Sequence, residues 1–176
     1  MKIVLMLLSL SVFAFGHTTI LESGGFGSGF LHPISGLDHI LAMVGVGMVA
    51  FFASKKGYLL LFAFMGAMII SAVIGYLGLH FVYVEEGILL SIAGIFALIG
   101  FANRISFNVI IAVIALFGMF HGFAHGAEFQ AGSFASYMAG FSLSTLGLHL
   151  SGIFLAYSFN RYITSRQTQN AVREIA

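Results

Sequence analysis

Five stretches of this chain are apolar over lengths close to a membrane crossing, and this pattern limits the folds open to it. A helix needs about 20 apolar residues to span the hydrocarbon core of a bilayer. Only 7% of the residues are charged, which is too few to cover a surface that faces water. We therefore expect an all-α polytopic membrane bundle of five transmembrane helices. The expected spans are Ile34–Ser54, Tyr58–Leu79, Gly87–Ala102, Phe107–Ala124 and Phe134–Phe159.

Residues 1–16, MKIVLMLLSLSVFAFG, form a separate apolar segment before these spans. One lysine precedes about 13 apolar residues, and Ala14-Phe15-Gly16 fits the small-x-small pattern of a cleavage site. The segment therefore predicts a cleavable signal peptide, after which the mature chain would begin at His17. An uncleaved first transmembrane helix is the alternative, although the apolar run is short for a crossing.

The basic residues after the signal segment favour one orientation in the membrane. With the mature N-terminus outside, each of them faces the cytoplasm, either in a connection between spans or on the tail 161–176. Five crossings within residues 17–160 thus obey the positive-inside rule. We expect one transmembrane domain whose C-terminus lies in the cytoplasm. The basic residues are Lys55, Lys56, Arg104, Arg161, Arg166 and Arg173.

On this topology, acidic residues and histidines gather on the outer side of the membrane. An ionised carboxylate inside a transmembrane helix costs about 2.5–3.5 kcal/mol, and by default it marks a functional site. His149, deep within the last span, is the one histidine apart from this group. The outer group comprises His17, Glu22, His32, Asp38, His39, His80, Glu85, Glu86, His121, His125 and Glu128.

Small residues recur every four positions at the start of the last span. Gly132, Ser136, Gly140 and Ser144 would form a groove into which another helix backbone can press. This pattern predicts close packing rather than chemistry. We expect the last helix to be central to the bundle.

Asp38 and His121 are expected at one depth on two different helices. Seventeen residues separate Asp38 from Lys55, and the same number separates Arg104 from His121. At 1.5 Å per residue, both side chains then lie about 25 Å above the inner boundary. We expect them to share a pocket that binds a divalent cation. The alternative is that they only pair with each other, or with backbone groups, and hold two helices together.

His121, His125 and Glu128 follow a spacing of four and then three residues, which places them on one face of a helix. The two imidazoles could chelate one ion. Glu128 would be a third ligand if the helix persists through Gly126.

The stretch HPISGLDH at residues 32–39 contains two histidines and an aspartate beside a proline and a glycine. Pro33 suits the first turn of a helix, and Gly36 would let another backbone come close. We interpret the stretch as a helix N-terminus that presents His32, Asp38 and His39. Asp38 and His39 point about 100° apart, so one can bind the ion while the other orients the ligand.

Other polar residues are candidate ligands on weaker grounds. His17, as the mature N-terminus, would offer both its α-amine and its imidazole to a divalent ion. His149 lies 12 residues before Arg161, about 18 Å above the inner boundary. We expect it to act as a relay ligand or proton acceptor; the alternative is a hydrogen bond to a neighbouring helix. Glu85 and Glu86 sit at the outer end of the third span, where either could be merely solvated.

Imidazole and carboxylate ligands without any cysteine suit borderline divalent ions. Ni²⁺, Co²⁺, Zn²⁺ and Cu²⁺ are not distinguished by residue type. The chain has no Gly-rich phosphate loop, so ATP does not drive it directly. Ligands concentrated outside, one imidazole midway and almost none inside favour uptake of a cation. Two other readings stay open: an intramembrane zinc-dependent hydrolase that activates water, and bis-histidine haem binding.

The motifs HPISGLDHILAM, VEEGI and FHGFAHGAE, in this order, resemble those of the HupE/UreJ family of nickel permeases. The resemblance covers essentially the whole mature chain. It implies a facilitator in the bacterial inner membrane that supplies Ni²⁺ for hydrogenase or urease maturation, without its own energy source and without catalytic activity. Cobalt is the nearest rival cargo. The family's motif residues fall on His32, Asp38, His39, Glu85, His121, His125 and Glu128.

The resemblance also bears on partners. It implies contact with the lipid bilayer and the metal ion, no organic cofactor and no nucleic acid. Hand-off to a cytoplasmic nickel chaperone and assembly into a homo-oligomer are both left open by the sequence.

Overall fold

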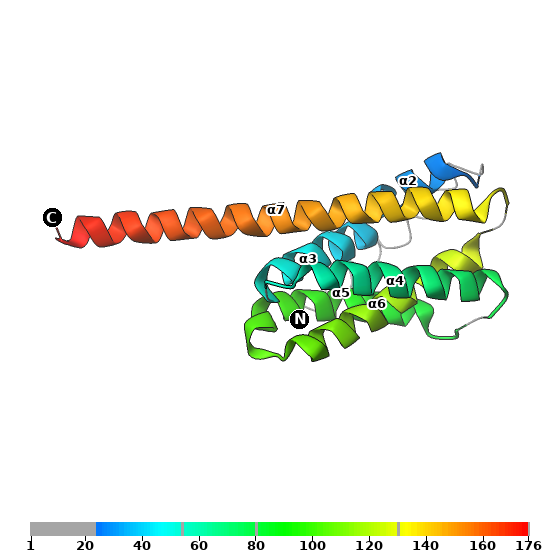
Figure 1. Cartoon of the computed structure of the whole chain (residues 1–176), viewed down its shortest axis with the longest axis horizontal. Coiled ribbons are helices and arrows are strands. Elements are labelled where there is room, and N and C mark those ends of the chain that lie inside the picture. Colours follow the sequence, from blue (N-terminus) through cyan, green and yellow to red (C-terminus); the bar gives the residue numbers. More distant parts are fainter. Residues whose placement is uncertain (1–23, 54, 80, 130, 176) are drawn as a thin grey trace, which may run out of the picture.

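The computed structural model describes residues 24–53, 55–79, 81–129 and 131–175, and every regular element in these ranges is a helix (Figure 1). The proposed signal peptide at 1–16, and also His17, Glu22 and His80, lie outside the described residues. The helices are α2 (Phe26–Ser35), α3 (Leu37–Ala53), α4 (Tyr58–Tyr76), α5 (Val84–Phe101), the 3₁₀ turn η1 (Ala102–Arg104), α6 (Phe107–Glu128) and α7 (Phe134–Ile175).

Four of these helices are long and apolar enough to cross a membrane. They are α4, α5 together with η1, α6 and α7. The fifth candidate is the pair α2 and α3, which passes the same test together but is bent by 84° at its break. The expected all-α membrane bundle is therefore confirmed, with four spans, or five if the bent pair counts as one.

The bend changes our interpretation of the first span. We expected one helix from Ile34 with Pro33 in its first turn, but Pro33 lies buried inside α2, toward its C-terminal end. The chain breaks at Gly36, which is extended (φ −104°, ψ 126°), and α3 begins at Leu37. Helices α2 and α3 pass the length and hydropathy test together, so hydropathy alone could not reveal the break.

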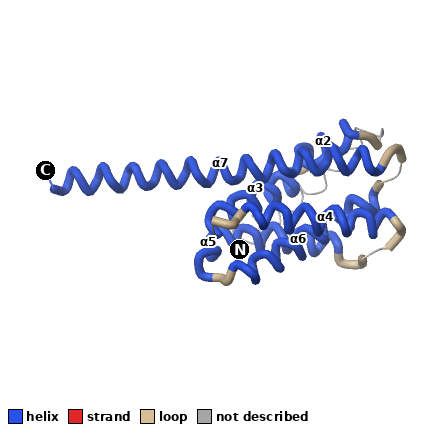
Figure 2. Tube along the Cα trace, in the orientation of Figure 1, coloured by secondary structure: helices blue, strands red, loops and turns tan. Residues whose placement is uncertain are grey.

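Helix α3 lies at the centre of the bundle and contacts every other described element. Helices α4 and α6 form one extensive pair, whereas α7 packs mainly against α2 and α3 (Figures 1 and 2). The prediction that the last helix is central is therefore wrong. The backbone of α2 does pack closely against α7 at Gly140, because an added Cβ there would collide with the Phe26 carbonyl.

Glycines on α6 bring this helix against the backbone of α4. An added Cβ at Gly118, Gly122 or Gly126 would each collide with a carbonyl of α4. Glycines spaced by four residues allow such close approach of two membrane helices. The contact fixes the rotation of α6 and therefore the direction of its histidines.

Helix α7 continues past the expected end of its span at Phe159 and runs unbroken to Ile175. Its C-terminal part projects beyond the other helices (Figure 1). Side chains from Tyr157 to Asn170 are exposed there.

Candidate metal site

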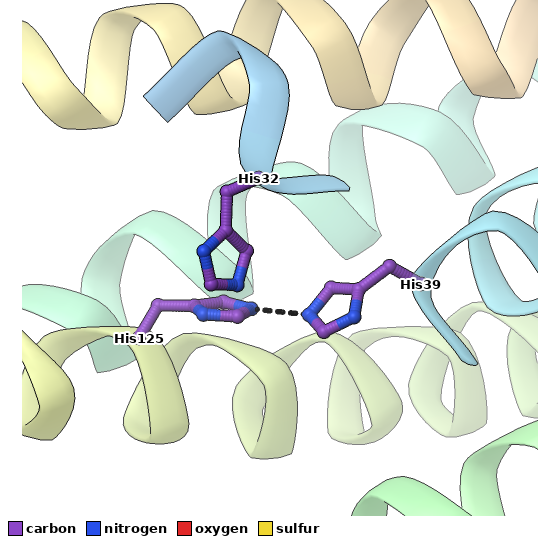
Figure 3. Close-up of side chains that lie close together, drawn as sticks. All are labelled: His32, His39 and His125. Atoms are coloured by element: carbon purple, nitrogen blue, oxygen red, sulfur yellow. Dashed lines mark hydrogen bonds between the residues drawn. The ribbon is translucent and has the colours of Figure 1, made fainter. Parts of the chain in front are cut away.

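Three histidines from three helices meet inside the bundle. His32 of α2, His39 of α3 and His125 of α6 can each offer one ring nitrogen so that all three nitrogens lie within 4.8 Å of one another (Figure 3). His39 and His125 are only 4% and 2% exposed, and His32 is half-buried. We call this group the histidine triad.

The bend between α2 and α3 explains how one broken span supplies two members of the triad. His32 lies in the last turn of α2, and His39 lies in the first turn of α3. In a straight helix these positions, seven residues apart, would be two turns and about 10 Å apart along the axis. Here their ring centroids are 5.2 Å apart.

Gly36 leaves room at this bend for the side chains that follow it. An added Cβ would lie 2.6 Å from Oδ1 of Asp38 and 2.8 Å from Nδ1 of His39. We expected Gly36 to admit another backbone, but its nearest neighbours are these two side chains.

Nε2 of His39 and Nε2 of His125 are 2.9 Å apart, a hydrogen-bond distance (Figure 3). On the other side of the His39 ring, Oδ1 of Asp38 lies 3.0 Å from Nδ1, an ion-pair distance at an angle outside hydrogen-bond geometry. The carboxylate favours a proton on Nδ1 of His39, which leaves Nε2 with its lone pair directed toward His125. Carboxylates often orient metal-binding histidines in this way.

Aromatic side chains of α7 cover the histidine triad. The Phe141 ring lies 4.4 Å from the His125 ring and 5.8 Å from the His32 ring, measured between centroids. Tyr137 lies 6.1 Å from His32. The triad is thus shielded from solvent on the side of α7.

The triad can hold a borderline divalent ion with little movement. Imidazole nitrogens bind such ions at about 2.0–2.1 Å, so two nitrogens on one ion lie about 3 to 3.4 Å apart. The His39 and His125 nitrogens, 2.9 Å apart, are close to this separation, and the spread of the whole set is at most 4.8 Å. An ion would replace the hydrogen bond between the two rings.

His121 lies next to the triad rather than within it. Its ring centroid is 5.8 Å from that of His39, and its Nε2 lies 3.0 Å from the Ser91 hydroxyl of α5. Asp38 and His121 both have His39 as a neighbour.

The remaining candidate residues lie elsewhere. Glu85 and Glu86 are exposed in the first turn of α5. Helix α6 does persist through Gly126, but it ends at Glu128, whose side chain is exposed. His149 is fully buried in α7, with Nδ1 bonded to the Met43 carbonyl of α3.

Three groups that shape the site were missed by the sequence analysis: Phe141, Ser91 and the Met43 carbonyl. Each belongs to an apolar run in which many positions have similar neighbours. No signal in the sequence separates them from ordinary core residues, because their role depends on the rotation of each helix.

The sequence model of the family described as HupE / UreJ protein matches residues 5–174 of this chain. The chain belongs to the HupE/UreJ family. The curated Protein HupE of Rhizobium leguminosarum bv. viciae is 38% identical over 161 residues, which cover 88% of this chain and 83% of that protein. No solved structure matches the chain.

Membership in the HupE/UreJ family confirms the resemblance that the three motifs indicated. HupE/UreJ proteins are transporter-type accessory membrane proteins, which agrees with the expectation that the chain is not an enzyme. In this HupE/UreJ chain, the first and last motifs supply all three members of the histidine triad.

Proposed function

We propose that this chain is a nickel permease that moves Ni²⁺ from the extracytoplasmic side to the cytoplasm, with the histidine triad as its capture site. One observation carries the proposal: nitrogens of three helices converge within 4.8 Å, with the Asp38 carboxylate behind one of them. The charge of a bound dication would be partly offset by this carboxylate. Partial compensation suits transport, since the ion must bind and also leave.

The direction of transport is proposed from charge distribution. Basic residues at the other ends of the helices favour an orientation with the triad near the outside. ATP would not drive transport directly, because the sequence has no phosphate-binding loop. The nickel would supply hydrogenase or urease, and cobalt is the competing cargo.

Three histidines around an open position are also the ligand set of catalytic zinc sites. A zinc-dependent hydrolase is therefore the second candidate. It would keep its metal through purification and cleave a lipid or peptide bond, whereas a permease binds its cargo reversibly and passes it across empty liposomes.

Uptake of radioactive nickel into proteoliposomes tests the proposal. We expect uptake by the wild-type protein without ATP, reduced by excess cobalt and abolished by His39→Ala. Glu86→Gln serves as the control, since Glu86 is exposed and outside the triad. Uptake by His39→Ala at the wild-type rate would contradict the capture site. A purified protein that retains zinc and does not transport nickel would favour the hydrolase.

A further inference from the structure

Below the histidine triad, two fully buried histidines each keep one nitrogen without a hydrogen-bond partner among the described residues. They are His121 of α6 and His149 of α7, both 0% exposed. Nδ1 of His121 and Nε2 of His149 are the nitrogens in question. A buried polar atom left unpaired is costly and calls for an explanation. We call these two residues the inner pair.

The hydrogen bonds of His149 show which nitrogen holds its proton. Nδ1 lies 2.7 Å from the Met43 carbonyl oxygen. A carbonyl only accepts, so Nδ1 carries the proton and donates it. Nε2 therefore has a lone pair, which is buried and has no partner in the described part of the chain.

The same reasoning applies to His121 through Ser91. The Ser91 hydroxyl donates its proton to the Ile88 carbonyl, at 2.7 Å. It must then accept from Nε2–H of His121, which is 3.0 Å away. Nδ1 of His121 thus carries a second buried lone pair that no residue described by the structure contacts as a hydrogen-bond donor. Neutral imidazoles in this state are metal ligands.

Both members of the inner pair pack against the same aromatic ring. Phe64 of α4 is 5.5 Å from the His121 ring and 5.3 Å from the His149 ring, measured between centroids. Thr145, one turn before His149 on α7, has a fully buried hydroxyl that also lacks a hydrogen-bond partner within the described residues. The interior between these helices therefore offers several polar atoms whose lone pairs could bind a metal ion.

The inner pair follows the histidine triad along the helices. On α6, His121 lies four residues, or about 6 Å, below His125 if the triad faces outward. On α3, Met43 lies the same distance below His39, and its carbonyl accepts the hydrogen bond from His149. The rings of His121 and His39 are 5.8 Å apart, so the first member of the inner pair is next to the triad.

We propose that His121 and His149 form a second, deeper station that receives the divalent cation from the histidine triad. The inference rests on the proposed transport function. An ion leaving the triad would meet the Nδ1 lone pair of His121 and then Nε2 of His149. Several weak stations in sequence lower the barrier for an ion inside an apolar core.

Two substitutions remove the lone pairs while keeping the structural hydrogen bonds. His149→Asn retains a donor for the Met43 carbonyl but lacks Nε2. His121→Gln retains a donor for Ser91 but lacks Nδ1. Ser151→Ala is the matched control on α7, because the Ser151 hydroxyl bonds only to the Leu148 carbonyl of its own helix.

Two measurements separate this proposal from the transport function itself. Equilibrium binding of radioactive Ni²⁺ to purified protein reports the triad, and uptake into proteoliposomes reports the whole path. We expect both variants to bind within about twofold of wild type but to lose uptake by about tenfold or more. Ser151→Ala should match wild type in both. Retained binding also shows that a variant is folded.

Uptake near the wild-type rate in either variant would overturn the inner pair and leave the triad intact. A loss of binding together with uptake in both variants would also overturn it, because the pair would then be part of the triad's support rather than a later station. If wild type itself neither binds nor transports Ni²⁺, the transport function fails first.

Discussion

At the scale of single residues, the site depends on which nitrogen of each imidazole keeps its proton. Asp38 beside Nδ1 of His39 directs the lone pair of Nε2 toward His125. The sequence identified all the members of the triad as ligand candidates. It could not select them from the larger group, because spacing gives the depth of a residue but not the rotation of its helix about its axis.

We predict that Asp38→Asn weakens Ni²⁺ binding by about 10- to 100-fold, because an amide neither attracts the Nδ1 proton as strongly nor offsets the ion's charge. Equilibrium binding to purified protein measures this effect. Glu86→Gln, which also neutralises a carboxylate, should bind as wild type does. Equal affinity in wild type and Asp38→Asn would show that the carboxylate has no role in orienting His39.

The three ligands should behave as one unit. His39→Ala and His125→Ala should each weaken Ni²⁺ binding by about 1.4 kcal/mol or more, that is tenfold or more. The loss of affinity in the double variant should be less than the sum of the two single losses, since one substitution already removes much of the site's affinity. A double-mutant cycle by calorimetry gives the coupling energy. Additive losses would indicate two residues that act independently.

At the scale of elements, the decisive feature is the bend between α2 and α3. Hydropathy predicted the existence of the long helices, with Tyr58, Phe107 and Phe134 as correct starts. The bend was missed because α2 and α3 together are apolar enough to pass as one span. Pro33 suggested a helix start, but it lies inside α2. This helix ends at Ser35, and Gly36 is its C-cap residue.

We predict that Gly36→Ala weakens Ni²⁺ binding by about tenfold while the protein stays folded. The added methyl would lie 2.6 Å from Oδ1 of Asp38, so that side chain and His39 must shift. The extended backbone at Gly36 itself accepts alanine. Gly66→Ala is the control, because nothing lies within 4 Å of its added Cβ. Unchanged binding by Gly36→Ala would mean that the bend tolerates the displaced side chains.

The contact between α3 and α7 should be equally sensitive. An added Cβ at Gly152 would collide with the Val44 carbonyl of α3, whereas one at Gly147 meets nothing within 4 Å. We predict that Gly152→Ala lowers the free energy of unfolding by about 1–3 kcal/mol. Gly147→Ala on the same helix should raise it slightly, by about 0.5–1 kcal/mol. Unfolding titrations in detergent compare the two variants, and similar values for both would contradict the proposed packing.

At the scale of the whole molecule, an apolar bundle carries polar ligands on several helices to one place. The all-α membrane fold could be predicted because a chain with so few charges has few other ways to satisfy its backbone in lipid. The length of α7 could not, since the polar residues after Phe159 do not indicate whether the helix stops. Its last turns lie beyond the bundle (Figure 1).

We predict that deletion of residues 165–176 leaves Ni²⁺ uptake within about twofold of wild type. The side chains of this segment whose burial is described, those of residues 165–170 and Arg173, are exposed, and substitutions at exposed positions usually have little effect. Arg161 remains in the shortened chain as the basic residue at the end of the span. Proteoliposome uptake by the shortened protein checks this. A loss of uptake with intact binding would assign the projecting part of α7 a role in release.

Nickel K-edge X-ray absorption on the purified protein, loaded with one equivalent of Ni²⁺, tests the central claim most directly. Imidazole ligands give a distinct scattering pattern that can be counted. The account predicts three imidazoles per nickel from His32, His39 and His125, and one fewer in His125→Ala. A nickel ion bound without imidazole, or an unchanged count in His125→Ala, would contradict it.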